Sequence, residues 1–466
     1  MHKFAKMLKI MGGGGKLSAS LRNGGGAMSG GAIGRDALRR VRKCFALAVV
    51  ALCVAAPAFA ETVAERWTFV KTGNNDGNYA YSNAWKDSDG VSRTWTAETS
   101  AEQIDYIIPN GYTFNMNYGD VNEAEFMLPQ NTDSTVTLYG TIQVMWIHTT
   151  IPNLVMKDSS KIYLHLARNA ASNFRKPRRV SGSARIDASD SAPAIFDTFA
   201  YNSNQMQTNA MIMTGSGAIR YTHKPSTADK SGQIVVTGDN SGFTGSVSIY
   251  KSGTDANKYM HLYVSSSENI GGNPATFKEK GLEISGAYLH IQGDTALGEN
   301  RGFYVSSDSS TVDVSSGATF TVPKKIGFAN GGYTLKKIGA GTMKVPGWTT
   351  GKVAVNAGTL NLVGATFANG AAGTPVSIGG SEYADGATVT LAVEGDGSEL
   401  PMANATNVLL VAESALPADF ADKVQLVGGD SAYTVPSRLK TRLVVVDGVK
   451  FALETEKSRG FMLIVK

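Results

Sequence analysis

The stretch Leu335–Leu362 has the sequence LKKIGAGTMKVPGWTTGKVAVNAGTLNL, in which short alternating runs of apolar and polar residues are separated by glycine turns. Successive side chains of a β-strand point to opposite faces. The alternation therefore predicts short strands that turn their apolar side chains toward one interior. These inward side chains are expected to be Met343, Val345, Val353, Val355, Leu360 and Leu362. We interpret the stretch as one coil of an all-β solenoid.

A second stretch, Gly232–Tyr250, has the sequence GQIVVTGDNSGFTGSVSIY and a similar arrangement. Its segment 234–236 aligns with 343–345, and its segment 247–249 aligns with 353–355. The loops between the aligned strands differ in length. Conserved strand spacing with variable loops is typical of stacked repeats whose loops project from the stack. The pair of stretches therefore predicts a divergent array of coils.

Both stretches resemble the autotransporter-associated β-strand repeat, with copies near 215–250 and 335–362. The resemblance implies a right-handed parallel β-helix, as in autotransporter passenger domains, and it implies no catalytic activity. Only 104 residues follow Leu362, whereas a dozen membrane strands need on the order of 250, so we expect no C-terminal translocator barrel. The repeat turns are expected at Gly238, Gly245, Gly339, Gly341, Gly347, Gly351 and Gly358.

Residues 1–60 have the pattern of a leader with a secretory signal peptide. A basic segment precedes an apolar run at 44–56, and an A-x-A site follows at Ala58 and Ala60. The apolar run has 13 residues, fewer than the roughly 20 that span a bilayer. We expect cleavage after Ala60, so that the mature chain begins at Glu61 and has no integral membrane span. Translation is expected to start at either Met1 or Met28, and the sequence does not decide between them.

Removal of this leader changes the charge and the cysteine content. The whole chain carries a net charge of +5, but residues 1–60 hold ten of the 44 basic and one of the 39 acidic residues, which leaves −4. The positive net charge of the whole chain therefore comes from the leader and gives no support for nucleic-acid binding. Cys44 and Cys53 also lie in the leader. The mature chain can thus form no disulfide and no cysteine-bound metal site.

The remaining chain divides by composition into three parts. Residues 61–130 are rich in loops and aromatic side chains, and we expect an N-terminal cap. Residues 131–386 are expected to form the β-helix, with about 10 coils of roughly 20–30 residues. Residues 387–466 are expected to form a small β module that covers the last coil. Within it, Asp447-Gly448 predicts a type I′ hairpin turn, 416–423 a helical turn and Phe461–Val465 a last strand.

Motifs for catalysis or cofactor binding are absent from the sequence. It contains no G-x-S-x-G, no H-E-x-x-H and no correctly spaced phosphate-binding loop. Asp87 and Asp89 lie in a short acidic loop without the spacing of a calcium motif, so we expect them to form turns. We therefore predict no enzyme, no cofactor and no metal. The alternative is a polysaccharide lyase or glycoside hydrolase with carboxylates on one outer face.

Two groups of residues are candidates for binding. The basic residues Arg175, Lys176, Arg178 and Arg179 are expected either to contact a polyanionic glycan or to lie in a solvated loop. The rings of Trp85 and Trp95 are expected either to stack on sugars or to fill the first coil. The sequence thus predicts an exported bacterial β-helix protein, adhesin-like or structural, that binds surface glycans or surface proteins. Its expected location is extracellular or at the outer cell surface, with the periplasm as the alternative.

Overall fold

The chain divides into two compact units, 1–63 and 64–466. The computed structural model describes residues of the second unit only, and their ranges are 65–70, 84–94, 103–116, 125–127, 129, 131–144, 148–165, 177–199, 206–223, 231–253, 258–366, 374–394, 404–428, 431–432 and 439–457. The predicted leader, its cleavage site at Ala58, Ala60 and Glu61, and the predicted strand Phe461–Val465 lie outside the described residues.

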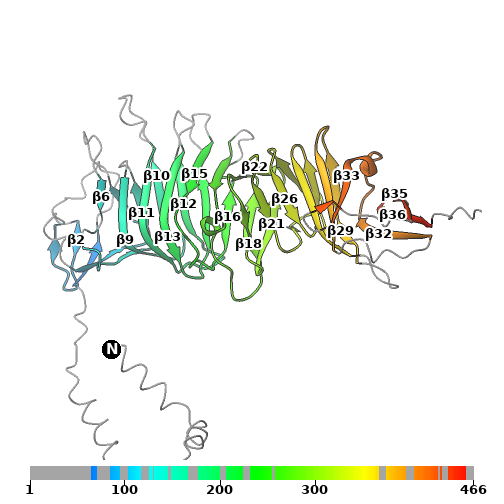
Figure 1. Ribbon diagram of the computed structural model, residues 1–466. Coiled ribbons are helices and arrows are strands. Elements are labelled where there is room, and N and C mark those ends of the chain that lie inside the picture. Colours follow the sequence, from blue (N-terminus) through cyan, green and yellow to red (C-terminus); the bar gives the residue numbers. More distant parts are fainter. Residues whose placement is uncertain are drawn as a thin grey trace, which may run out of the picture. The chain divides into compact units, whose positions relative to one another are not determined.

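The described strands form four sheets, of which sheet A is the largest (Figure 1). The order of sheet A is β3 (Ser92–Arg93), β2 (Trp85–Lys86), β1 (Glu65–Phe69), β4 (Ile104–Ile108), β7 (Val136–Leu138), β9 (His148–Met156), β11 (Arg179–Ile186), β13 (Gln207–Thr214), β15 (Gly232–Val236), β17 (Met260–Val264), β19 (Tyr288–Ile291), β22 (Ser310–Val314), β25 (Thr334–Ile338), β27 (Lys352–Val355) and β30 (Gly380–Tyr383). A further strand, β6 (Glu125–Met127), pairs with β9.

Two more long sheets run beside sheet A, and a short mixed sheet follows. Sheet B is ordered β24 (Gly327–Phe328), β21 (Arg301–Ser307), β18 (Lys278–Ser285), β16 (Val247–Tyr250), β14 (Ile219–His223), β12 (Ala194–Phe199), β10 (Lys161–His165), β8 (Thr141–Val144) and β5 (Thr113–Met116). Sheet D is ordered β20 (Thr295–Ala296), β23 (Thr319–Thr321), β26 (Thr342–Val345), β28 (Thr359–Thr366), β31 (Thr388–Glu394), β33 (Val424–Gly428) and β34 (Ser431–Ala432). Sheet F contains β29 (Val376–Ile378), β32 (Ala405–Ala412), β36 (Lys450–Lys457) and β35 (Leu439–Val446).

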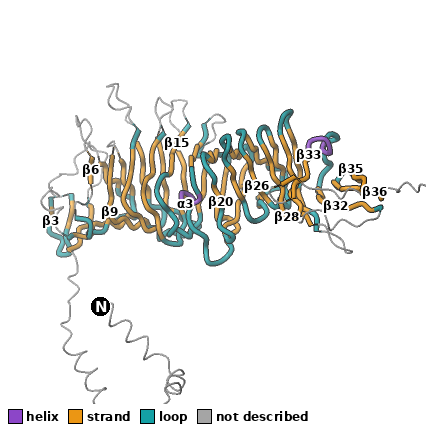
Figure 2. Tube along the Cα trace, viewed as in Figure 1, coloured by secondary structure: helices purple, strands orange, loops and turns teal. Residues whose placement is uncertain are grey.

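Successive coils of the chain stack on one another through parallel strand pairs. In sheet A, for example, β15 pairs with β17 and β17 pairs with β19, while the strands of sheet B lie between them in the sequence. Figure 2 shows these strands side by side, joined by loops; among the described residues the helices are the short α3 (Ser267–Ile270) and α4 (Phe420–Lys423). The predicted fold class is confirmed: the chain is all-β, with long parallel sheets as in a parallel β-helix.

The interior of the stack is formed by the inward side chains that the alternation predicts. All six apolar residues predicted to face inward between 343 and 362 have 0% exposed surface. The stretch is not a single coil, however. Met343 of β26 pairs with Leu360 of β28, and Leu335 of β25 pairs with Val353 of β27. The stretch therefore contains two successive coils, because each strand pairs with the equivalent strand of the next coil.

The two aligned stretches occupy different faces of the stack. Segment 234–236 belongs to β15 of sheet A, whereas its aligned segment 343–345 belongs to β26 of sheet D. Likewise 247–249 lies in sheet B and 353–355 lies in sheet A. Strand–turn–strand units with the same alternation can occupy any pair of neighbouring faces. The aligned segments therefore share a sequence pattern but do not occupy equivalent positions in the stack.

The ends of the stack have antiparallel strands. At the first end, β2 and β3 pair antiparallel onto β1, and the ring of Trp85 is fully buried. At the other end, β31 and β33 continue the parallel pairing of sheet D beyond residue 386, whereas β32, β36 and β35 pair antiparallel. The predicted type I′ turn joins β35 to β36, with positive φ at Asp447 (54°) and Gly448 (71°).

Candidate functional site

A groove of about 560 Å³ lies on the outer side of sheet B, within the size range of ligand-binding clefts. It is lined by β14, β16 and β18, which are neighbours in sheet B, and by the turn 190–193 before β12. Outward side chains of these strands form most of the lining, and the buried residues Ala218 and Ile219 complete it. Its charged lining residues are Asp190, Arg220, Lys278, Glu279, Lys280 and Glu283.

The cations of this groove are engaged by neighbouring groups. The guanidinium of Arg220 lies 4.7 Å from the centroid of the Tyr250 ring, and its Nε donates a hydrogen bond to Ser248 Oγ at 3.4 Å. Lys278 donates to a backbone carbonyl at 3.2 Å, and the Lys280 ammonium lies 4.8 Å from another tyrosine ring. The three carboxylates form no hydrogen bond or ion pair with any described residue. They remain available as acceptors.

A second cluster, the His–Tyr ladder, lies on the outer side of sheet A and consists of His261, Tyr263, Tyr288, His290 and Asp313. The register of β17 and β19 places His261 beside Tyr288 and Tyr263 beside His290. The ring centroids of these pairs are 4.6 Å and 4.1 Å apart, and the rings are nearly parallel. The rings therefore cover one another, which leaves few ring faces for stacking with a ligand.

The hydrogen bonds of the ladder fit an arrangement in which both histidine rings are neutral. His290 Nδ1 lies 2.9 Å from Asp313 Oδ2, and His290 Nε2 lies 2.9 Å from His261 Nδ1. A carboxylate accepts, so His290 Nδ1–H donates to it, and His290 Nε2 of the neutral ring must accept. His261 Nδ1–H then donates to His290, and His261 Nε2 carries an unshared electron pair. This arrangement requires both rings to be neutral.

The pKa values of the histidines fit that arrangement. Burial, with His290 and His223 nearby, lowers the pKa of His261 to about 4. Burial also lowers the pKa of His290, although Asp313 opposes that change. His223, at the end of β14, has 1% exposed surface, and neither ring nitrogen has a hydrogen-bond partner among the described residues. Its burial, together with the positive charges of Lys251 and Lys258, lowers its pKa to about 4.

Two buried cations hold backbone carbonyls inside the stack. The side chain of Arg301 has 0% exposed surface and donates to the carbonyl oxygens of Phe243, Gly245, Gly272 and Gly281. Lys337 is also fully buried, and its Nζ donates to the carbonyl oxygens of Ile338, Gly339 and Ala357. Burial lowers the pKa of Lys337 to about 8 and that of Arg301 to about 10. Both residues serve the fold, because they point inward.

The predicted polyanion cluster is not presented on one surface by the described residues. Arg178 has 2% exposed surface, and its backbone N–H donates to the Gln207 side chain at 2.6 Å. Arg179, the next residue, points outward from β11 and is exposed. Neighbouring residues of a strand face opposite sides, which separates the two guanidinium groups. Arg175 and Lys176 lie outside the described residues.

The aromatic residues near the first coil pack against each other. Trp85 has 0% exposed surface, and its ring centroid lies 5.2 Å from those of Phe69 and Tyr106. Trp67 is 3% exposed and packs edge-on against Tyr106. These contacts support the interpretation that the rings fill the first coil, because a buried ring offers no face to a sugar. Trp95 lies outside the described residues.

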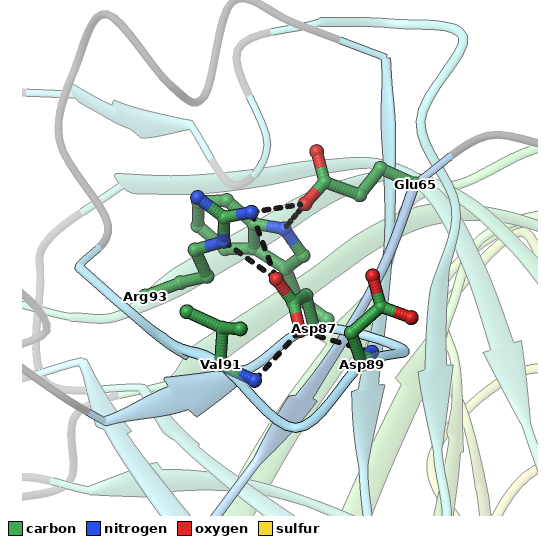
Figure 3. A network of polar contacts seen from close by, with 6 residues as sticks. Glu65, Asp87, Asp89, Val91 and Arg93 are labelled. Atoms are coloured by element: carbon green, nitrogen blue, oxygen red, sulfur yellow. Dashed lines mark hydrogen bonds and ion pairs between the residues drawn. The ribbon is translucent and has the colours of Figure 1, made fainter.

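The acidic loop at Asp87 forms a turn, as Figure 3 shows. Asp87 Oδ1 accepts from the backbone N–H groups of Asp89 (3.0 Å) and Val91 (2.8 Å), and Oδ2 accepts from Arg93 Nε (2.9 Å). Burial would raise the pKa of Asp87, but these hydrogen bonds outweigh it and hold the pKa below its ordinary value. The carboxylate is thus satisfied within the turn, as predicted for an aspartate that closes its own backbone.

The predicted repeat glycines lie where the coils turn. Gly347 (φ 113°) and Gly351 (φ 76°) adopt the backbone conformation that only glycine adopts easily. Gly339 and Gly358 also have positive φ. At Gly238, Gly245 and Gly341 a Cβ atom would collide with backbone oxygen atoms of the neighbouring coil. The glycines therefore allow close stacking of the coils.

The described part of the chain contains no group of three or more His, Cys, Asp or Glu side chains arranged to hold a metal ion. No helix within it has the length and apolar character needed to cross a membrane. No family model, curated protein or solved structure matches the chain. The resemblance to the autotransporter-associated repeat therefore stays a prediction.

Proposed function

We propose that this chain is an exported bacterial protein that acts at the cell surface or outside the cell as a non-catalytic β-helix scaffold. Its role is adhesin-like or structural, and its outer faces and connecting loops bind surface glycans or surface proteins. The autotransporter-associated resemblance and the leader pattern support export. The observation that carries the scaffold role is the uninterrupted parallel pairing of sheet A from β4 to β30. Such pairing uses the interior for stability and leaves the outward side chains for contacts.

Export is tested by expression of the full chain in a two-membrane bacterium, followed by N-terminal sequencing and protease treatment of intact cells. We expect a mature chain that begins at Glu61 and is cleaved by external protease. The variant Ala58→Arg with Ala60→Arg is the control, because large charged side chains block an A-x-A cleavage site. An unprocessed wild-type chain that stays in the cytoplasm would contradict the proposal.

The groove on sheet B favours a second candidate function, action on a polysaccharide. Three carboxylates that have no hydrogen-bond or ion-pair partner among the described residues line a groove of ligand size. Glycoside hydrolysis uses a pair of carboxyl groups as acid and base or nucleophile. Incubation of the purified protein with a panel of polysaccharides, including polyuronates, tests it. Release of short saccharides that stops in the variant Glu283→Gln would support an enzyme. If every polysaccharide of the panel stayed intact, the result would favour the scaffold role over an enzyme.

A further inference from the structure

The groove on sheet B has unused hydrogen-bonding capacity of a specific kind. Asp190, Glu279 and Glu283 accept no hydrogen bond from any residue that the structure describes, and the hydroxyl groups of Ser191 and Ser246 lie along the same lining. Hydrogen bonds to carboxylate oxygens are about twice as strong as those between neutral groups. A ligand that donates many O–H groups would therefore satisfy this lining, whereas a ligand that only accepts would leave the carboxylates desolvated and unpaired.

The charges of the groove are balanced. Three acidic and three basic residues line it, so the lining gives no net attraction to a polyanion or to a polycation. The cations are also held by Tyr250, by a backbone carbonyl and by a second tyrosine ring. They are therefore not oriented as a free fork for carboxylate or phosphate groups. Charge thus gives no preference for a strongly ionic ligand.

The groove has room for an extended ligand, and an exposed aromatic residue precedes its lining in the sequence without being part of that lining. It crosses three neighbouring strands of sheet B, which at about 4.8 Å per strand spacing separates the outer two by about 10 Å. Phe277, directly before the lining residue Lys278, has 53% exposed surface, the joint largest among exposed apolar side chains of the described residues. Aromatic rings next to polar groups pack against the C–H faces of sugar rings.

We propose that this groove binds an uncharged oligosaccharide across β14, β16 and β18. The hydroxyl groups of the sugar donate to Asp190, Glu279 and Glu283, and its apolar face packs on Phe277. This inference deepens the proposed function, because it names the class of surface glycan that the scaffold recognises. A metal-dependent lectin site is not part of it, since no metal-binding cluster is found among the described residues.

The test uses the purified mature chain and titration calorimetry with defined hexasaccharides. Three neutral probes, a β-1,4-glucan, a β-1,4-mannan and an α-1,4-glucan, are compared with a galacturonate hexamer and a chitosan hexamer. We expect at least one neutral probe to bind, with affinity that changes less than twofold between 50 and 500 mM salt, because uncharged ligands are not screened. Binding of only the galacturonate or the chitosan hexamer would overturn the proposal, as would no binding to any probe.

Variants locate the bound probe. Glu283→Gln and Phe277→Ser are each expected to weaken its binding at least tenfold. The matched control is Ile212→Ser, because Ile212 has 52% exposed surface on the outer side of sheet A. Near-UV circular dichroism checks that all three variants stay folded. An equal loss of binding affinity in Phe277→Ser and Ile212→Ser would refute the site. Unchanged affinity in both Glu283→Gln and Phe277→Ser would also refute it. Export is measured separately, so a cytoplasmic chain that binds the probe would contradict only the proposed function.

Discussion

The buried, neutral histidine His223 makes the stability of the stack sensitive to acid. In the folded chain its pKa is about 4, whereas in the unfolded chain it is near 6.5. The unfolded state therefore takes up a proton first as the pH falls. The stability contribution is fully present above pH 6.5 and is lost as the pH falls toward 4. Between pH 7 and pH 4.5 the difference in proton uptake amounts to about 2 kcal/mol.

The substitution His223→Leu isolates this effect. Leucine is similar in size and has no proton to take up, so the variant should lose about 2 kcal/mol less stability than the wild type over that pH range. At pH 7 it should be at least as stable, because two buried ring nitrogens that have no hydrogen-bond partner among the described residues are removed. The other histidines are present in both chains, so their titration cancels except for the part of the His261 pKa shift that His223 causes.

Urea unfolding at pH 7 and pH 4.5, followed by tryptophan fluorescence, measures the difference. The matched control is His148→Leu, because His148 is exposed at the start of β9 and should keep the wild-type pH dependence. If His223→Leu lost as much stability at pH 4.5 as the wild type, the reasoning from the buried neutral ring would be refuted.

Two further substitutions test buried residues. Lys337→Met should lower the free energy of unfolding by about 2 kcal/mol, because three buried carbonyls lose their donor. Lys336→Met, on the exposed outer side of the same strand, should change it by less than about 0.5 kcal/mol in the same urea titration. Trp85→Ala should cost about 3–5 kcal/mol and expose the first coil to proteolysis. Loss of glycan binding in Trp85→Ala without loss of stability would contradict its packing role.

Much of the fold could be predicted from local sequence, because side-chain alternation and turn chemistry are local. Met343 and Val345 are buried as the alternation requires, and Asp447-Gly448 forms the expected turn. The assignment of strands to faces could not be predicted. It depends on the lengths of the connections, and similar strand–turn–strand units fit any two neighbouring faces. For this reason 335–362 contains two coils and not one.

Most of the candidate site could not be predicted from the sequence, because it also depends on which strands become neighbours. In the sequence, His261 and His290 lie 29 positions apart, and His290 and Asp313 lie 23 positions apart. Only the register of β17, β19 and β22 brings these three residues together. The groove likewise combines segments from about 190 to 283. One signal was available for the buried cations. Lys337 occupies an inward position in the alternation that begins at Leu335, where a lysine requires several hydrogen-bond acceptors.

The stacking of coils is the central claim, and a distance between spin labels tests it most directly. Lys344→Cys with Asn361→Cys places labels on paired residues of β26 and β28, about 4.8 Å apart at the backbone. Lys344→Cys with Lys352→Cys places them on different sheets, although these residues are closer in the sequence. Stacked coils predict strong dipolar broadening of the electron paramagnetic resonance spectrum for the first pair and weaker broadening for the second. The reverse order would contradict the parallel stack.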